Sequence, residues 1–260
     1  MLSTILDGLS LGAIYALIAL GYTMVYGIAK MLNFAHGDII MVGAYAILVT
    51  LNATGHPILG VIAAVIVCTI VGIVIEKVAY KPLRGASPLA VLITAIGVSY
   101  LLQSIAQLIF KSKSQAVTIT ETHMVNIGSA ELNLNTLLTL VVGAVIMVAL
   151  TLFVKYTRTG RAMQAVSEDR GAAQLMGVNV NKIIMITFAI GSALAACAGV
   201  FYLMQIPSVS PTLGSMPGIK AFAAAVIGGI GSIPGAMLGG VLLGVVEKLA
   251  LSVPVLAPYA

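Results

Sequence analysis

Charged residues are scarce in this sequence, and tryptophan is absent. Only 8% of the 260 residues are Asp, Glu, Lys or Arg, and 60% are hydrophobic. A soluble domain carries about 25% charged residues, so this composition excludes an ordinary soluble protein and places the chain in a lipid bilayer. The net charge of +5 is not gathered into a dense basic run. The sequence therefore gives no indication of nucleic-acid binding.

Cysteines and catalytic motifs are also few. The two cysteines, Cys68 and Cys197, lie in apolar stretches and form no CxxC pair. The sequence has no GxxxxGK[ST] motif for ATP phosphates, no GxSxG and no HExxH. His36 and Asp38 are too few for a metal site, which needs three or four ligands. We therefore expect this chain itself to have no catalytic residues, no metal and no cofactor.

Long charge-free runs predict membrane-spanning helices, because about 20 mostly apolar residues cross the hydrocarbon core. Five runs are suitable: 8–29, 57–75, 88–110, 135–154 and 183–204. Further candidates are the stretch after Asp38, the short stretch 221–230, and the stretch ending near Leu251. We predict an all-α, polytopic transmembrane bundle of about eight spans, forming one domain over residues 1–260, with two short or interrupted membrane segments.

The basic residues predict how the chain is oriented. They gather after the run 57–75, as Lys77, Lys81 and Arg84, and after the run 135–154, as Lys155, Arg158, Arg161, Arg170 and Lys182. Cytoplasmic loops collect Lys and Arg, so both connections should face the cytoplasm. Alternation then places the loops 111–134 and 205–218, the N-terminus and Ala260 on the outer side.

The stretch "NFAHGD", 33–38, predicts an interrupted span. The apolar run 39–51 that follows it has 13 residues, or about 20 Å as a helix, which is too short to cross. "GGIGSIPG", 228–235, interrupts a second apolar stretch. Interrupted segments in both halves of a transporter point to its substrate path. The candidate pathway residues are Asn33, Phe34, His36, Gly37, Asp38, Thr94, Ser99, Gln103, Gly228, Gly229, Gly231 and Ser232.

Simpler roles remain open for several of these residues. Asp is a favoured helix N-cap, and capping of a helix that starts at Ile39 is the preferred interpretation of Asp38 over direct substrate contact. His36 is more often a hydrogen-bonded structural residue than a ligand. Ser99, Gln103 and Gln107 recur every four residues, a pattern typical of contacts between helices. Glycines at four-residue spacing, Gly8–Gly12 and Gly240–Gly244 among them, indicate close helix crossings.

The loop 158–182 contains a predicted short helix. Ser167 is a suitable N-cap, Glu168 and Asp169 suit the positive first turn, and Gly177 can supply the left-handed stop. We therefore predict a helix over 168–176 that a soluble motor protein could grip. A helix lying on the membrane surface is an equal alternative on these residues alone. The candidate docking residues are Ser167, Glu168, Asp169, Arg170, Ala172, Ala173, Leu175, Met176 and Gly177.

Five stretches together resemble the permease subunits of ABC importers for branched-chain amino acids. They are "LGAIYALIALGYTMVYGIAKMLNFAHGDIIMVGAY" (11–45), "EKVAYKPLRGAS" (76–87), "LITAIGVSYLLQ" (92–103), "GRAMQAVSEDRGAAQLMGVN" (160–179) and "GIKAFAAAVIGGIGSIPGAMLGGVLLGVVE" (218–247). Within them "AAQLMG", 172–177, looks like the xAAxxxG loop on which the ATPase docks, with Gly171 where the broader motif often has Glu. The resemblance also implies one more apolar span than this sequence contains.

The resemblance implies a transport complex in a bacterial inner membrane. It implies a second homologous permease, two ATP-binding subunits that hold ATP and Mg²⁺, and an extracytoplasmic substrate-binding protein. Alternating access would move leucine, isoleucine, valine or similar amino acids inward. Two alternatives stay open: a permease of the same type for urea, short amides or a sugar, and a secondary transporter that acts alone.

Overall fold

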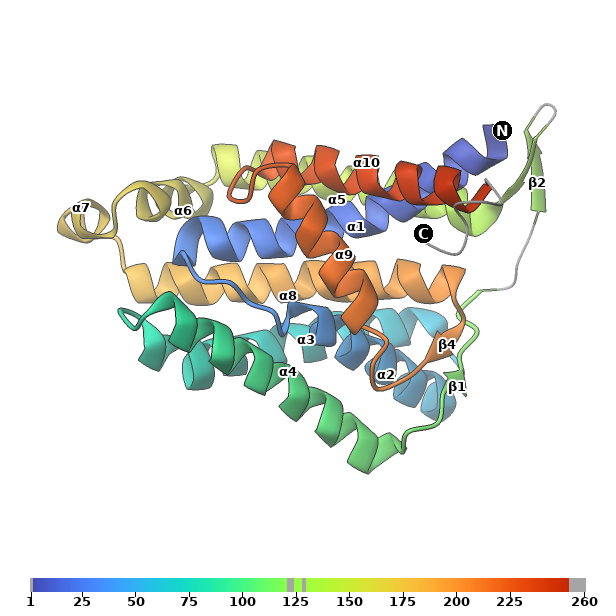
Figure 1. The fold of residues 1–260 in the computed structure, drawn as a ribbon, viewed down its shortest axis with the longest axis horizontal. Coiled ribbons are helices and arrows are strands. Elements are labelled where there is room, and N and C mark those ends of the chain that lie inside the picture. Colours follow the sequence, from blue (N-terminus) through green and yellow to red (C-terminus); the bar gives the residue numbers. More distant parts are fainter. Residues whose placement is uncertain (1, 121–123, 128–129, 253–260) are drawn as a thin grey trace.

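The computed structural model describes residues 2–120, 124–127 and 130–252 and forms an elongated bundle of helices (Figure 1). The helices are α1 (Leu2–Ala29), α2 (His36–Thr54), α3 (Pro57–Ile75), the π-helix η1 (Glu76–Tyr80), the 3₁₀ helix η2 (Lys81–Leu83), α4 (Pro88–Phe110), α5 (Leu134–Tyr156), α6 (Arg158–Glu168), α7 (Arg170–Leu175), α8 (Val180–Gln205), α9 (Ser215–Ile227) and α10 (Ile233–Ser252). This arrangement confirms the predicted all-α bundle.

Two short antiparallel strand pairs lie in the described part of the chain. β1 (Gln115–Ala116) pairs with β4 (Ser208–Val209), and β2 (Met124–Ile127) pairs with β3 (Ala130–Asn133). Both pairs belong to the predicted outer loops. Parts of those loops, residues 121–123 and 128–129, lie outside the described residues, as does the C-terminal stretch 253–260, for which we expected the outer side.

Seven of the described helices are long and apolar enough to cross a membrane: α1, α2, α3, α4, α5, α8 and α10. The expected span at 221–230 is instead part of α9, which has 13 residues. At 1.5 Å per residue α9 is about 20 Å long, too short for a full crossing. The prediction of about eight spans is therefore refined to seven full spans and one short apolar helix among the described residues.

The centre of the bundle is α1, which packs against α10, α8, α9 and α5. Its glycines allow α10 to approach closely, because a Cβ on Gly12 would lie 2.7 Å from the Cα of Val241, and one on Gly8 would lie 2.9 Å from the Cα of Val245. From α10, Gly244 meets the backbone of Gly12 in turn. The predicted crossing through glycines at four-residue spacing is thus confirmed for α1 and α10.

The predicted basic connections lie together at one end of the bundle, here called the basic end. This end includes the C-terminus of α1, the turn 81–87, α6, α7 and the N-terminus of α8 (Figure 1). Arg84 donates to Asn181 beside the start of α8, and Arg170 donates to the carbonyl of Ala29 at the end of α1. The N-terminus of α1 and both strand pairs lie at the opposite end (Figure 1).

Two helices, α2 and α9, begin inside the bundle. After α1 ends, the chain turns back along the bundle before α2 starts (Figure 1). The side chain of His36, the first residue of α2, occupies the space beside Gly21. Gly21 precedes the end of α1 by eight residues, or about 12 Å along the helix axis. The prediction that the second span begins below the membrane surface agrees with this geometry.

The position of α9 is set by polar contacts with α10 and α1. Lys220 in α9 forms an ion pair with Glu247 in α10, with a distance of 3.0 Å between Nζ and Oε1. The hydroxyl of Tyr15 in α1 donates to the other carboxylate oxygen of Glu247 at 2.9 Å. Charged groups inside a membrane protein are stable when they are paired in this way. The three helices are therefore held together around one carboxylate.

Candidate functional site

The segment between α1 and α2 is held by two residues of the predicted pathway set. The amide oxygen of Asn33 accepts a hydrogen bond of 2.9 Å from the hydroxyl of Tyr80 in η1. His36 is buried and meets the ring of Tyr22 edge-on, with 4.8 Å between ring centroids. Neither Asn33 nor His36 lines the pocket described below. Their contacts fix the start of α2, which is the structural role that the sequence left open for His36.

Asp38 does not cap a helix at Ile39, so the preferred interpretation of this residue was wrong. α2 already begins at His36, with Ala35 at the N-cap position and no side-chain cap. The Asp38 carboxylate instead accepts hydrogen bonds from the hydroxyl of Ser99 and from the side-chain amide of Gln103, the latter at 2.9 Å. The carboxylate therefore joins α2 to α4 across the bundle.

A third helix meets the same group of polar residues. The amide nitrogen of Gln103 lies 3.4 Å from the hydroxyl of Ser215 at the start of α9. Gly37 lies against the backbone of the same helix start, because a Cβ on Gly37 would be 2.6 Å from the carbonyl oxygen of Gly214 and 3.1 Å from the Cα of Gly218. The starts of α2 and α9 are therefore in direct backbone contact.

These helix starts enclose a pocket of about 270 Å³. Five predicted pathway residues line it: Phe34, Gly37, Asp38, Ser99 and Gln103. Sequence reasoning missed seven others: Tyr22, Ile96, Tyr100, Gly214, Ser215, Gly218 and Ile219. The glycines 214 and 218 stand four residues apart, so a search for small residues at that spacing could have found this contact. Thr94 does not line the pocket.

The stretch 228–232 lies elsewhere, so the two predicted interruptions do not meet. Gly229 and Gly231 have φ angles of +89° and +101° and form the turn between α9 and α10. A Cβ on Gly27, near the end of α1, would lie 3.4 Å from Gly231, which places this turn at the basic end. Gly231 and Ser232 line a separate pocket of about 240 Å³. The two interruptions do not meet because the stretch 228–232 follows the end of α9, whereas Gly37 contacts the start of α9.

The predicted docking loop forms two helices where the sequence indicated one. α6 is capped by Thr157 and runs to Glu168, and α7 then begins at Arg170. Ser167 is therefore inside α6, where its hydroxyl donates to the carbonyl of Gln164 at 2.7 Å. Asp169 is the actual cap of α7, because its carboxylate accepts from the backbone N–H groups of the second and third following residues at 2.7 and 3.0 Å. An Asp cap with extended backbone ends one helix and starts the next.

The end of α7 is the predicted left-handed stop. Gly177 has a φ angle of +84°, and the N–H of Val178 donates to the carbonyl of Ala173 at 3.0 Å, as in a Schellman motif. Just before this stop, Leu175 and Met176 are 90% and 84% exposed. The tip of α7 thus presents two large apolar side chains at the basic end.

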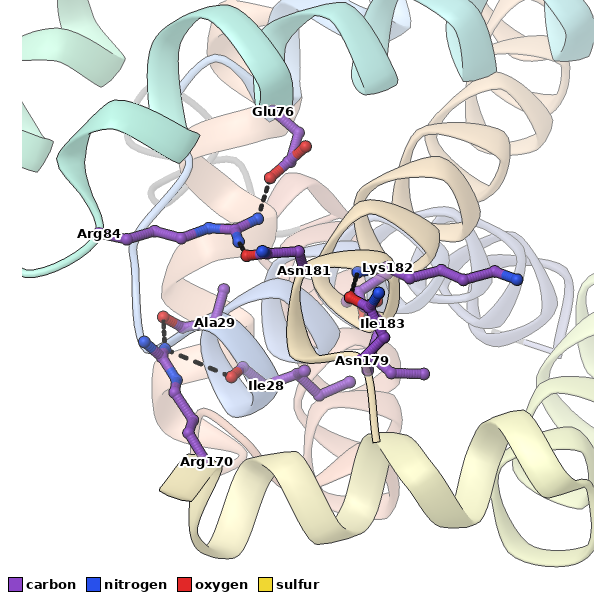
Figure 2. A network of polar contacts seen from close by, with 10 residues as sticks. Ile28, Ala29, Glu76, Arg84, Arg170, Asn179, Asn181, Lys182 and Ile183 are labelled. Carbon is purple, nitrogen blue, oxygen red and sulfur yellow. Dashed lines mark hydrogen bonds and ion pairs between the residues drawn. The ribbon is translucent and has the colours of Figure 1, made fainter. Parts of the chain in front are cut away.

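Arg170 links α7 to the membrane-spanning helices (Figure 2). Its guanidinium donates to the carbonyls of Ala29 and Ile28, which have no helical partner because α1 ends there. Figure 2 shows Arg84 beside this contact, reaching toward Glu76 and Asn181. Residues 30–35, which follow Ala29, lead directly to Asp38, so a short path of chain connects α7 with the pocket.

Comparisons with known proteins agree with these features. The protein family described as "Branched-chain amino acid transport system / permease component" matches residues 4–257. The permease protein BraD of a high-affinity branched-chain amino acid transport system in Pseudomonas aeruginosa is 44% identical over 97% of this chain and 87% of its own length. LivH of Escherichia coli K12, a permease protein of such a system, is 41% identical over 96% of this chain and 85% of its own length. A probable branched-chain amino acid transport permease protein LivH of Methanocaldococcus jannaschii is 32% identical over 90% of this chain and 76% of its own length.

Proposed function

Because this chain belongs to the family of permease components of branched-chain amino acid transport systems, we propose that it carries leucine, isoleucine and valine across a membrane as one subunit of an ATP-driven importer. The observation that carries this proposal is the family match over residues 4–257. The match includes both helix starts of the pocket and the α6–α7 loop. It favours branched-chain amino acids over urea, short amides or a sugar.

The pocket at the starts of α2 and α9 is the proposed place of substrate passage. Its polar side, Asp38 with Ser99 and Gln103, suits an ammonium group, since a carboxylate attracts a cation strongly where water is scarce. Its apolar side, which includes Phe34 and Ile219, suits a branched aliphatic side chain. Interrupted helices whose N-termini lie inside the membrane supply such sites in many transporters.

A second homologous permease would complete this site. Tyr100 and Ile219, which line the pocket, are 66% and 60% exposed. Exposed apolar side chains at the rim of a partly polar pocket fit coverage by another membrane-embedded protein better than coverage by lipid, because lipid cannot pair with the polar groups. In this proposal two permease chains face each other and enclose the path.

The α6–α7 loop is the proposed docking site for the ATP-binding subunits, which would hold ATP and Mg²⁺. Leu175 and Met176 would insert into the motor subunit. Movement of α7 would then reach the end of α1 through Arg170 and the pocket through residues 30–35. ATP drives such a cycle only if it binds the two states of the complex with different affinity. An extracytoplasmic binding protein would deliver substrate at the opposite end, and the membrane would be the bacterial inner membrane.

The test is uptake of labelled leucine by the complex reconstituted in vesicles with its ATP-binding subunits and binding protein. We expect ATP-dependent uptake that unlabelled isoleucine and valine reduce and that urea and ribose do not. Competition by urea or ribose without competition by isoleucine would overturn the proposed substrate. Uptake by the chain without ATP-binding subunits, driven by an ion gradient, would favour the secondary transporter.

The docking site has its own test. Leu175→Asp should reduce co-purification of the ATP-binding subunit and abolish uptake, while the chain still inserts in the membrane. Ser112→Asp adds the same charge to an exposed residue at the opposite end of the bundle and serves as the control. Normal co-purification and uptake with Leu175→Asp would place the motor contact elsewhere.

A further inference from the structure

A second pocket, with a basic wall, lies at the basic end of the bundle. Its volume is about 430 Å³. Three cationic residues from different parts of the chain line it: Lys30 after α1, Arg84 in the turn before α4, and Arg170 in α7. The apolar part of its wall includes Leu32 and Val91. The pocket is separate from the one around Asp38, with which it has no lining residue in common.

The cations of this pocket are only partly neutralised. Glu76 pairs with Arg84. Arg170 donates to carbonyls, and neither it nor Lys30 is in an ion pair among the described residues. The three cations against one carboxylate leave an excess of two positive charges. Burial and the neighbouring charge of Arg84 lower the pKa of Arg170.

A free donor remains at the same place. The Nε atom of Arg84 is buried and has no hydrogen-bond partner among the described residues. A buried donor without a partner is costly, and a charged group raises that cost. An anion with several oxygen acceptors could accept from this group and would also separate two guanidinium groups that repel each other. A phosphate group has both the charge and the number of acceptors.

The surroundings indicate where such a phosphate would come from. The pocket includes Pro88 and Val91, in the first turn of α4. Along α4 the apolar side chains of Leu89 and Ile93 are 65% and 61% exposed. Unlike the rim of the pocket at Asp38, where polar groups lie beside Tyr100, the start of α4 exposes Leu89 and Ile93 as apolar side chains, and such a surface suits hydrocarbon. The basic wall therefore continues into a surface suited to acyl chains.

We propose that this pocket binds the phosphate headgroup of an anionic phospholipid, whose acyl chains lie along the first half of α4. Basic pockets between membrane-spanning helices on the cytoplasmic side bind anionic headgroups in this manner. The bound phosphate would bridge the turn 81–87 with α7 and the end of α1. A lipid would thus stabilise the segment that connects α7 to the membrane-spanning helices. The proposal does not depend on the transported substrate.

The experiment uses the full chain in a neutral detergent and measures its thermal unfolding and, by native mass spectrometry, its lipid adducts. The probes are dioctanoyl phosphatidylglycerol, dioctanoyl phosphatidylcholine and inorganic phosphate. We expect phosphatidylglycerol to form adducts and raise the unfolding temperature, with little effect of the other two. An equal effect of phosphatidylcholine would overturn the proposal, and an effect of inorganic phosphate equal to that of phosphatidylglycerol would overturn the lipid as its source.

Variants test the pocket itself. Lys30→Asn removes one charge, and Asn tolerates the φ angle of +52° at this position. A basic residue near an anionic headgroup contributes enough that its loss should weaken phosphatidylglycerol binding about fivefold. Lys182→Asn removes the same charge from an exposed residue at the same end that does not line the pocket, and should change binding little. Equal loss in both variants would indicate attraction by net charge alone and would refute the site.

Arg84 needs a paired variant, because removal of Arg84 alone leaves Glu76 buried without its partner. Arg84→Gln/Glu76→Gln keeps a possible hydrogen bond between the two side chains and leaves the net charge at the pocket unchanged, but it removes the guanidinium with its free Nε donor. If this double variant folds, its binding of phosphatidylglycerol should be weaker than that of the wild type. Unchanged binding by both this variant and Lys30→Asn would refute the proposal.

Discussion

The backbone contact between α2 and α9 can be tested by adding a single methyl group, in Gly37→Ala. The new Cβ would lie 2.6 Å from the carbonyl oxygen of Gly214, whereas ordinary contacts begin at 3.4 Å. The overlap of 3.4 − 2.6 = 0.8 Å involves backbone on both sides, so no side chain can rotate away. The starts of the two helices would have to separate.

The magnitude follows from two opposing effects. Overpacking of this kind destabilises by about 1–3 kcal/mol. Replacing a helical Gly by Ala stabilises by about 0.5–1 kcal/mol. The net expectation for Gly37→Ala is therefore a loss of roughly 0–2.5 kcal/mol relative to the wild type, and of roughly 1–3 kcal/mol relative to a variant that has the helix-propensity gain alone. Because the pocket lies at this contact, we also expect ATP-dependent leucine uptake to fall when measured at a temperature where the protein is folded.

Gly97→Ala is the matched control. Gly97 lies in α4, and a Cβ there would meet nothing within 4 Å, so only the helix-propensity gain should remain. Both variants would be compared with the wild type by thermal unfolding in detergent and by uptake in vesicles. If Gly37→Ala were as stable and as active as Gly97→Ala, the close approach of α2 and α9 would be wrong.

Three further substitutions test individual contacts. Asp38→Asn keeps an acceptor for Gln103 and should retain more stability than Asp38→Ala. The alanine variant loses two hydrogen bonds to a charged group, at about 1.5–3 kcal/mol each. Equal unfolding temperatures of the two variants would contradict these bonds. Asp169→Ala should destabilise the start of α7 by about 1 kcal/mol and weaken co-purification of the ATP-binding subunit, whereas Asp169→Asn should preserve the cap. An equal loss of stability and co-purification in both variants would refute the capping role of Asp169. Gly177→Ala should cost about 1–2 kcal/mol because of its positive φ angle; hydrogen exchange in α7 would measure this loss, and unchanged exchange would contradict the left-handed stop.

Most of the span architecture was predictable from local properties of the sequence. The length of each apolar run predicted about eight spans, of which seven are membrane-length helices, and the positions of the basic residues grouped the basic loops at one side. The glycines at positions 8, 12, 240 and 244 predicted a close crossing, because small residues at four-residue spacing lie on one helix face. The short run after Asp38 predicted that the second span starts below the membrane surface, and the packing of His36 beside Gly21 agrees with that prediction.

The predictions that were wrong concern residues that could each play the same local role, such as helix capping. Ser167 and Asp169 are both good caps, and the sequence favoured the first. The structure uses the second, because α6, capped by Thr157, continues through Ser167. Likewise Asp38 could cap a helix or bind another helix. Only the position of α4, which brings Ser99 and Gln103 to its carboxylate, decides between the two.

The membrane location of the protein, the positions of its long spans and the grouping of its basic loops could all be predicted from the sequence, because run length, charge and residue size act within one segment. Which of the interrupted segments meet depends on the packing of the helices. Gly37 contacts Gly214 and Gly218, while 228–232 lies at the basic end. That outcome depends on the direction and length of α9, and these follow from its packing between α1, α2 and α10 and from its ion pair with α10. No single segment of the sequence contains that information, since such contacts join residues far apart in the chain.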